Sequence, residues 1–238
     1  MSEIFSRQNI VFGSDSLEKL KNSRVAVFGV GGVGGYVCEA LARSGVGEID
    51  IVDNDTVAPS NINRQIIALH STVGRNKVEV CKERLLDINP DLKVNAHNCF
   101  FLKENESEFE FEKFDYIVDA IDTVSGKLAL AVIADKLSIP IISSMGAGNK
   151  TDPTQFKVSD IYKTSVCPLA KAMRKLCREN NVKKLKVVYS EELPTIKEVL
   201  VDETSNKRQT PGSLSFVPSV VGLIMAGEVV KDLIGFGG

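Results

Sequence analysis

The chain has 238 residues, a length that suits one large domain or two small ones. Hydrophobic residues make up 43% of the chain and charged residues 25%, which are ordinary values for a globular protein with a sizeable core. The net charge of −2 excludes a global field that would attract nucleic acid, so any such contact requires a local basic patch.

The first half of the chain alternates predicted strands and helices. Residues 24–28 form a short, β-branched apolar run that ends at glycines, which is typical of a buried strand. Helical spacing follows over 33–44, and a second strand at 48–53 ends in acidic residues. Further helices are expected at about 72–88 and 124–137, and further strands at 93–98, 116–121 and 139–143. This rhythm predicts an α/β fold with a doubly wound, Rossmann-like, mostly parallel sheet.

The composition changes after Ser144 and predicts a C-terminal elaboration of the same domain. A turn-rich segment at 145–153 is followed by an expected strand at 155–161 and an expected helix at 169–178. A polar segment at 201–213 is expected to be a mobile loop over the site, and an apolar helix at 217–233 is expected to pack on the sheet. We therefore expect one domain over residues 1–238.

Cysteine usage and the N-terminus indicate the compartment. Five widely spaced cysteines contain no C-x-x-C pair, which indicates a reducing compartment and gives no support for a structural zinc site. Residues 1–7 lack the apolar segment of a secretory signal, and the apolar stretch at 216–227 is too short to span a membrane. We expect a cytoplasmic protein without a membrane span.

A glycine-rich turn follows the first strand and opens the first helix, with Gly29, Gly31, Gly32 and Gly34. Glycines suit this place because the backbone must turn tightly and approach a phosphate closely, and the helix N-terminus adds free N–H groups. Asp53 follows 19 residues after Gly34, where a carboxylate can accept hydrogen bonds from ribose hydroxyls. The pattern predicts a nucleotide site, although a tight turn alone would also explain the glycines.

A nicotinamide-dependent dehydrogenase, or an NAD sensor, is the alternative that such a turn leaves open. Three features favour ATP instead. Arg64 and Lys77 are cations available to a triphosphate. Asp119 and Asp122 end the fourth strand, where a carboxylate could hold the Mg²⁺ that accompanies phosphates. The chain has only two histidines, so it offers few candidates for hydride chemistry.

Each of these residues also has a plain structural explanation. Arg64 and Lys77 could be exposed solubilising charges, Asp119 and Asp122 could cap a helix, and Asn61 could be a turn residue. Their order along the chain favours the functional interpretation.

Six motifs resemble, in this order, those of the ubiquitin-activating-enzyme-like adenylating family: Gly29-Val-Gly-Gly-Val-Gly, Val52-Asp-Asn-Asp-Thr-Val, Ser60-Asn-Ile-Asn-Arg-Gln, Val73-Gly-Arg-Asn-Lys77, Ile88-Asn-Pro and Asp119-Ala-Ile-Asp122. Members of that family activate a carboxylate as an acyl-adenylate and release pyrophosphate. The resemblance covers about residues 5–160. It implies a nucleotide-binding half at about 5–150 and a substrate-side elaboration at about 151–238.

The resemblance implies which residues hold ATP: the four glycines of the turn with Asp53, Asp55, Asn61, Arg64, Lys77 and Asp122. Asp53 would hold the ribose, while Asn61, Arg64 and Lys77 would contact the phosphates. Asp122 would bind the Mg²⁺ that bridges them.

The resemblance also implies a homodimer. Arg7 is similar to an N-terminal arginine that reaches across a homodimer into the ATP site of the partner. The implied catalytic set is therefore Arg64, Lys77, Asp122 and Arg7.

Two branches of the family differ after the fifth strand. Members that adenylate a ubiquitin-like sulfur carrier usually have paired C-x-x-C zinc motifs there, and this chain has none. Residues 145–148, 152–161, 163–164 and 168–171 are instead similar to the dehydratases that act on threonylcarbamoyladenosine in tRNA. Those enzymes activate a carboxylate on the modified base with ATP, and a neighbouring nitrogen closes a ring. Carrier adenylation stays an alternative, and a sulfur-relay or redox protein partner is left open.

A basic run between Lys171 and Lys186 fits a tRNA partner, because clustered lysines and arginines attract phosphates independently of sequence. A solvated helix face would also explain it. The predicted tRNA contacts are Lys171, Arg174, Lys175 and Arg178.

Two features keep the substrate side open. Cys167 precedes Pro168 near the start of the basic helix, where a dipole could stabilise a thiolate. A covalent thioester role for Cys167 is conceivable, as in some relatives. The implied chemistry does not obviously need a protein nucleophile, because the attacking nitrogen belongs to the substrate, so the sequence leaves a catalytic role for Cys167 open. The chain is also compact between Tyr189 and Phe216 beside those dehydratases, which leaves open a cation site built from that region.

Overall fold

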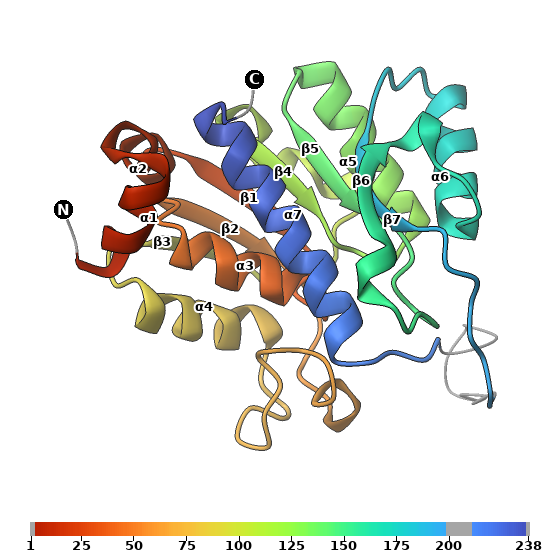
Figure 1. Cartoon of the computed structure of the whole chain (residues 1–238), viewed down its shortest axis with the longest axis horizontal. Helices are drawn as coiled ribbons and strands as arrows, with labels where there is room; N and C mark the ends of the chain where they lie inside the picture. Colours follow the sequence, from red (N-terminus) through yellow and green to blue (C-terminus); the bar gives the residue numbers. More distant parts are fainter. Residues whose placement is uncertain (1–2, 199–210, 237–238) are drawn as a thin grey trace.

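One seven-stranded sheet forms the centre of the computed structural model, which describes residues 3–198 and 211–236. The strand order is β3-β2-β1-β4-β5-β7-β6 (Figure 1). The strands are β1 (Arg24–Phe28), β2 (Glu48–Val52), β3 (Lys93–His97), β4 (Tyr116–Asp119), β5 (Ile141–Ser144), β6 (Phe156–Asp160) and β7 (Lys186–Ser190). Neighbouring strands pair in parallel except β6 and β7, which are antiparallel. The chain changes direction across the sheet between β1 and β4, and ligands bind at such a switch point.

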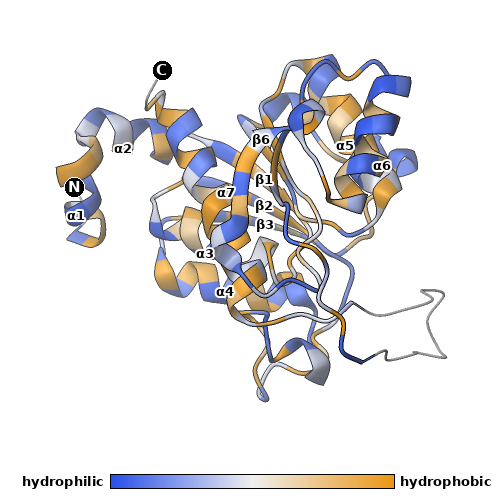
Figure 2. Ribbon diagram, turned by 45° about the vertical axis from the view of Figure 1, so that its right-hand side comes forward, coloured by the Kyte–Doolittle hydropathy of each residue, from blue (hydrophilic) through white to orange (hydrophobic). Residues whose placement is uncertain are grey.

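Helices cover both faces of the sheet. The α-helices are α1 (Ser6–Phe12), α2 (Ser14–Lys21), α3 (Gly34–Arg43), α4 (Lys77–Ile88), α5 (Val124–Leu137), α6 (Pro168–Glu179) and α7 (Phe216–Ile234). Short 3-10 helices span Glu3–Phe5, Pro59–Asn61, Lys103–Glu108, Phe111–Lys113, Pro153–Gln155 and Ile161–Lys163. Figure 2 shows α3, α4 and α7 on one face and α5 and α6 on the other. The predicted α/β, doubly wound, mostly parallel fold is confirmed.

The strands form where short apolar runs are predicted. β1 and β2 each bury four of their five residues, because helices cover both faces of the central sheet. The strand expected at 155–161 forms β6, the antiparallel edge strand. Helix α5 has the predicted bounds, and α7 packs on the sheet as expected.

The helix expected at 72–88 begins only at Lys77. Gly74 has a positive φ of 86°, and Asn76 is extended and forms a β-bridge with Thr56. These conformations are incompatible with a helix, so residues 72–76 form turns instead. The shift places Lys77 at the first helical position, facing the carboxyl edge of the sheet.

Three elements are not anticipated by the sequence patterns. Helix α1 has seven residues and buries none of them, and α2 has eight and buries only Leu20, so neither gives a long apolar pattern in the sequence. The third is β7, whose apolar core of three residues follows a lysine-rich segment. It lies between β5 and β6, so residues from the second half of the chain complete the same sheet.

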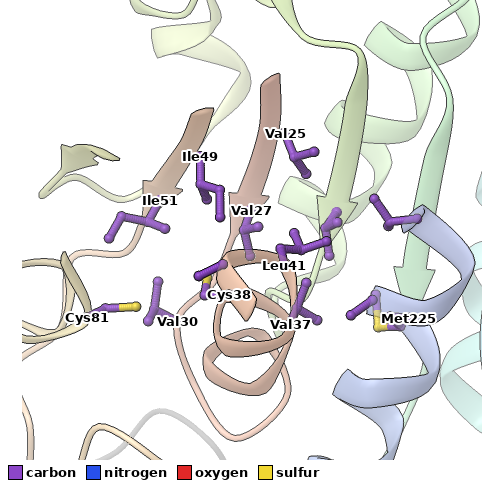
Figure 3. Close-up of a cluster of buried hydrophobic side chains, with 14 of the residues drawn as sticks. Val25, Val27, Val30, Val37, Cys38, Leu41, Ile49, Ile51, Cys81 and Met225 are labelled. Atoms are coloured by element: carbon purple, nitrogen blue, oxygen red, sulfur yellow. The ribbon is translucent and has the colours of Figure 1, made fainter. Parts of the chain in front are cut away.

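The largest core cluster lies between the sheet and the face formed by α3, α4 and α7 (Figure 3). Cys38 of α3 and Cys81 of α4 are both buried free thiols within it. The interaction with Cys81 and burial raise the pKa of Cys38.

Helix α7 crosses α3 at close range. A β-carbon on Gly222 would lie 2.4 Å from the carbonyl oxygen of Val33, which immediately precedes α3, so only glycine permits this approach. No helix in the described part of the chain is long and apolar enough to cross a membrane.

Residues 201–210 of the segment that was expected to be a mobile loop, 201–213, lie outside the described residues. Of the remainder, Gly212 exchanges hydrogen bonds with Asn149: its N–H donates to Oδ1 at 2.7 Å and its carbonyl accepts from the Asn149 N–H at 2.8 Å. Asn63 donates to the Ser213 carbonyl at 3.0 Å. Gly212 therefore lies against the loop after β5, and Ser213 lies against the segment that carries Arg64.

Candidate active site

A cavity of about 530 Å³ lies at the carboxyl edge of the sheet, where β1, β2 and β4 end. Two larger cavities, of about 730 and 980 Å³, both include Tyr116 at the amino end of β4 and lie away from the glycine turn. The cavity at the carboxyl edge is lined by Gly29, Gly31, Gly32, Val33, Val52, Asp53, Asn54, Asp55, Asn61, Arg64, Gln65, Lys77, Cys99, Phe100, Phe101, Ala120, Ile121, Asp122, Thr123 and Pro218. Most of the predicted nucleotide residues thus surround one cavity.

The glycine turn owes its shape to close backbone packing. Gly29 has φ +90°, and a β-carbon there would lie 2.7 Å from the carbonyl oxygen of Ala120. A β-carbon on Gly34, the first residue of α3, would lie 1.8 Å from the carbonyl oxygen of Gly29. Glycines at these positions bring the helix N-terminus, with its free N–H groups, beside the cavity. Gly31 and Gly32 line the cavity itself.

Asp53 is fixed between the glycine turn and the segment that follows β2. Its Oδ2 accepts a 2.7 Å hydrogen bond from the Val30 N–H, and its Oδ1 accepts one of 2.8 Å from the Asp55 N–H. Two backbone N–H donors therefore orient the Asp53 carboxylate just after the carboxyl end of β2. In nucleotide-binding sheets of this kind, a carboxylate at this position accepts hydrogen bonds from ribose hydroxyls.

Lys77 brings a nearly buried positive charge to the cavity. Only 5% of the residue is exposed, and its Nζ lies 2.7 Å from Oδ2 of Asp55 and 4.0 Å from Oδ1 of Asp53. Lys77 is therefore not the exposed, solubilising charge that the sequence analysis left open as an alternative. An ammonium in this position can stabilise charge on a phosphate.

Arg64 and Asn61 lie on the segment between β2 and α4. Asn61 is buried and its Oδ1 accepts from the Ala58 N–H at 3.1 Å, so it closes a turn as well as lining the cavity. Arg64 donates from Nη1 to the Ser60 carbonyl at 2.7 Å and to Oδ1 of Asn63 at 3.0 Å. Burial lowers the pKa of Arg64. Both partners are neutral, so they leave the guanidinium charge available to an anion.

The two acidic residues after β4 have different surroundings. Asp119 is fully buried, and both of its oxygens lie 3.1 Å from Nζ of Lys127. Asp119 is therefore held in a buried ion pair and does not line the cavity. Asp122 is exposed and lines the cavity. Within the described residues, no group of three histidine, cysteine, aspartate or glutamate side chains could hold a metal ion.

Several cavity residues were not predicted. Cys99, Phe100 and Phe101 follow β3, and the end of a third parallel strand at the same edge was the signal that could have indicated them. Phe100 is 44% exposed and gives the cavity an apolar side. Pro218 enters from α7 and Gln65 follows Arg64.

Arg7 does not reach the cavity of its own chain. It is exposed on α1, and the neighbouring Gln8 donates to the Ser44 carbonyl at 2.8 Å. Ser44 follows the last residue of α3, which begins at the glycine turn and is about 15 Å long. Arg7 is thus held at the opposite edge of the sheet from the cavity.

The predicted tRNA contacts lie on α6, away from the cavity lining. Lys171, Lys175 and Arg178 are exposed, whereas Arg174 is half-buried and donates to the carbonyl and hydroxyl oxygens of Thr164 at 2.7 and 2.6 Å. Arg174 therefore anchors the segment before the helix. Cys167 is 3% exposed and packs near Gly146.

The comparisons with known proteins agree with this arrangement. A family model described as the ThiF family matches residues 5–238. The tRNA threonylcarbamoyladenosine dehydratase of Bacillus subtilis is 48% identical over 239 residues, covering 97% of this chain and 94% of that relative.

Solved structures give the same result. The crystal structure of Escherichia coli tRNA N6-threonylcarbamoyladenosine dehydratase, TcdA, in complex with AMP matches with a TM-score of 0.89 at 32% identity, covering 98% of this chain and 94% of that one. The complex of TcdA with ATP matches with a TM-score of 0.88 over the same fractions. The resemblance to the adenylating family is confirmed, and the chain belongs to the ThiF family.

Proposed function

We propose that this protein uses ATP to dehydrate threonylcarbamoyladenosine in tRNA, forming the cyclic base. The observation that carries the proposal is the cavity at the carboxyl edge, where the glycine turn, Asp53, Lys77 and Arg64 face one space. TcdA, a relative named for this reaction, matches nearly the whole chain and binds ATP.

The chemistry has two steps. A carboxylate oxygen of the threonylcarbamoyl group attacks the α-phosphorus of ATP, and pyrophosphate leaves with the electron pair of the broken P–O bond. The neighbouring substrate nitrogen then attacks the activated carbonyl and loses its proton as AMP departs, so the base loses one water overall. Both nucleophiles belong to the substrate, which agrees with the burial of Cys167. Holding the reacting groups together supplies the proximity contribution.

The proposed roles follow the geometry of the cavity. Asp53 accepts from the ribose, and the turn that Asn61 closes presents Arg64 to the phosphates. Lys77 and Arg64 stabilise the charge that develops on pyrophosphate as it leaves. The glycine turn brings the N-terminus of α3 to the same phosphates.

Mg²⁺ is part of the proposal, with Asp122 as its protein ligand. Magnesium is usually held by one or two carboxylates together with substrate phosphates, so the exposed carboxylate of Asp122 at the cavity fits it. Asp55, which is also exposed at the cavity, pairs with Lys77 instead. Bound there, the ion would neutralise phosphate charge.

A homodimer and a tRNA-binding face complete the proposal. Arg7 is remote from the cavity of its own chain, and we propose that it acts on the site of a second copy. Lys171, Lys175 and Arg178 of α6 attract the tRNA backbone. We propose a single domain over residues 1–238 that acts in the cytoplasm; a sulfur-relay or redox partner is left to experiment.

One assay separates the proposal from its alternatives. Purified protein is incubated with ATP, Mg²⁺ and tRNA that carries threonylcarbamoyladenosine, and AMP release and nucleoside mass are followed. We expect stoichiometric AMP and the loss of one water from the nucleoside. Pyrophosphate exchange that depends on a carrier protein ending in Gly-Gly, with tRNA inert, would favour carrier adenylation. Tight NAD binding without ATP binding would favour the dehydrogenase.

A further inference from the structure

Lys127 is a buried cation that the proposed reaction does not use. It lies in the first turn of α5 and is 1% exposed. Besides both oxygens of Asp119 at 3.1 Å, its Nζ donates to the Ser144 carbonyl at 2.7 Å and lies 3.4 Å from the Ser143 hydroxyl oxygen. The Ser143 hydroxyl donates in turn to Oδ2 of Asp119 at 2.5 Å. One ammonium thus joins the ends of β4 and β5.

The two strand ends lead to different sides of the candidate site. Asp119 precedes residues 120–123, all four of which line the cavity, and its Oδ1 accepts from the Ile121 N–H at 3.3 Å. Ser144 precedes residues 145–150, the loop that reaches Gly212 through Asn149 and the N-terminal end of α6 through Gly146. Lys127 therefore contacts the origin of the segment at the nucleotide and the origin of the segment on the proposed substrate side.

Stability alone gives a poor reason for this ion pair. Buried pairs are often replaced by apolar residues at no loss of stability, because desolvation offsets their attraction. A fully hydrogen-bonded buried network does fix one geometry, since any displacement leaves a buried charge unsatisfied. Reacting groups require such fixed supports, because a small misplacement costs much of the rate.

We propose that Lys127 is a positioning residue for adenylation, which holds the segment carrying Asp122 and the loop after β5 at a fixed separation. It does not line the cavity and acts only through Asp119 and Ser144. The proposal rests on the proposed function, because it assumes that the loop after β5 faces the acyl substrate.

The test uses a pair of substitutions that leaves no buried charge. Lys127→Met alone strands the Asp119 carboxylate and can fail to fold, so it is combined with Asp119→Asn. We expect the double variant to keep the melting temperature and ATP affinity of the wild type. AMP formation with modified tRNA should fall about 100-fold, in line with a misplaced reacting group. Amide hydrogen exchange should become faster in residues 120–123 and 145–150.

The matched control combines Arg24→Met with Asp50→Asn, which removes a second ion pair with a buried carboxylate at the other end of the sheet. It should lower the melting temperature and leave kcat and exchange in both segments unchanged. Three results for the Lys127→Met/Asp119→Asn variant would each overturn the proposal. They are a wild-type rate of AMP formation, wild-type amide exchange in both segments, and a loss of activity fully explained by a lower melting temperature. Exchange needs no tRNA, so it tests Lys127 even if the wild-type protein proves inactive on tRNA.

Discussion

The carbonyl oxygen of Gly29 occupies the place that a β-carbon on Gly34 would require, with only 1.8 Å between the two positions. The obstacle is backbone, which cannot rotate away as a long side chain can. The turn and the first residue of α3 are therefore packed against each other without room for one methyl group.

Gly34→Ala should consequently destabilise the protein and weaken ATP binding together. Overpacking of this kind costs about 3 kcal/mol or more. In a protein of this size that corresponds to a fall in melting temperature of about 6–12 °C. Thermal unfolding and ATP titration calorimetry measure both effects. Gly227→Ala is the control, because no atom lies within 4 Å of its β-carbon position, and it should be neutral or stabilising. Equal behaviour of the two variants would contradict the account of the turn.

Lys77→Met should preserve the fold and remove most of the activity. Methionine fills a similar volume, but it cannot stabilise charge on the phosphates, and loss of one such group costs about 100- to 1,000-fold in rate. AMP release under saturating ATP is the measurement. Lys136→Met on the exposed side of α5 is the control and should turn over normally. A Lys77→Met enzyme with near-normal turnover would remove this residue from the phosphate site.

Arg64→Ala should abolish pyrophosphate release while the protein stays folded. Its guanidinium is held by two neutral oxygens, so its removal leaves no buried carboxylate unpaired. Arg64→Lys should recover part of the rate, because the charge returns without the planar fork. Pyrophosphate release and circular dichroism measure the two properties. Normal pyrophosphate release by the Arg64→Ala variant would contradict the proposal that Arg64 contacts the phosphates.

The proposed binding of tRNA by α6 can be tested by replacing its exposed basic residues separately from the half-buried Arg174. Replacing Lys171, Lys175 and Arg178 by alanine should weaken tRNA binding without affecting ATP. The slope of log affinity against log salt should fall by about one for each lost phosphate contact. Arg174→Ala should instead lower stability by about 2 kcal/mol, because it loses its charge-assisted hydrogen bonds to Thr164. Filter binding across salt concentrations would disprove the tRNA role if the triple variant kept its affinity and slope.

The contacts of Asp50 predict that the free energy of unfolding decreases in acid. Burial by itself would raise the pKa of Asp50, but hydrogen bonds from His97, Arg24 and Asn95 outweigh it and lower the pKa to about 2 from the ordinary 3.8. The folded state therefore binds this proton less readily than the unfolded chain. The resulting stability, about 2–3 kcal/mol, is complete above pH 4 and is lost as the pH falls towards 2. Asp50→Asn should lack this part of the decline in denaturant titrations at pH 2–5, and identical pH profiles would refute it.

The sequence predicts the central sheet and the nucleotide side of the site well. Gly29 and Asp122 follow predicted parallel strands and Asp53 ends one, and the carboxyl ends of such strands meet at one edge. Local patterns carry that information, so the position of these residues follows from the strand assignments.

Local patterns give less information about which charged side chains are buried. Asp119 and Asp122 are alike in sequence, so their different surroundings are not visible from it. Lys127 and Arg174 differ from these carboxylates, because helical spacing places Lys127 on the face of Leu130, Ala131 and Ala134 in α5. It likewise places Arg174 beside Ala170, Met173 and Cys177 in α6. Helical periodicity could therefore have separated Arg174 from Lys171.

The close crossing of α7 over α3 has a consequence for synthesis of the protein. Gly222 lies against the Val33 carbonyl and Pro218 lines the cavity, so an element translated long after the glycine turn completes the pocket that the turn begins. A nascent chain stopped before residue 216 carries the whole glycine turn but lacks the element that packs behind it. The ability to bind ATP should accordingly appear only when α7 has emerged from the ribosome, well after the glycine turn has done so.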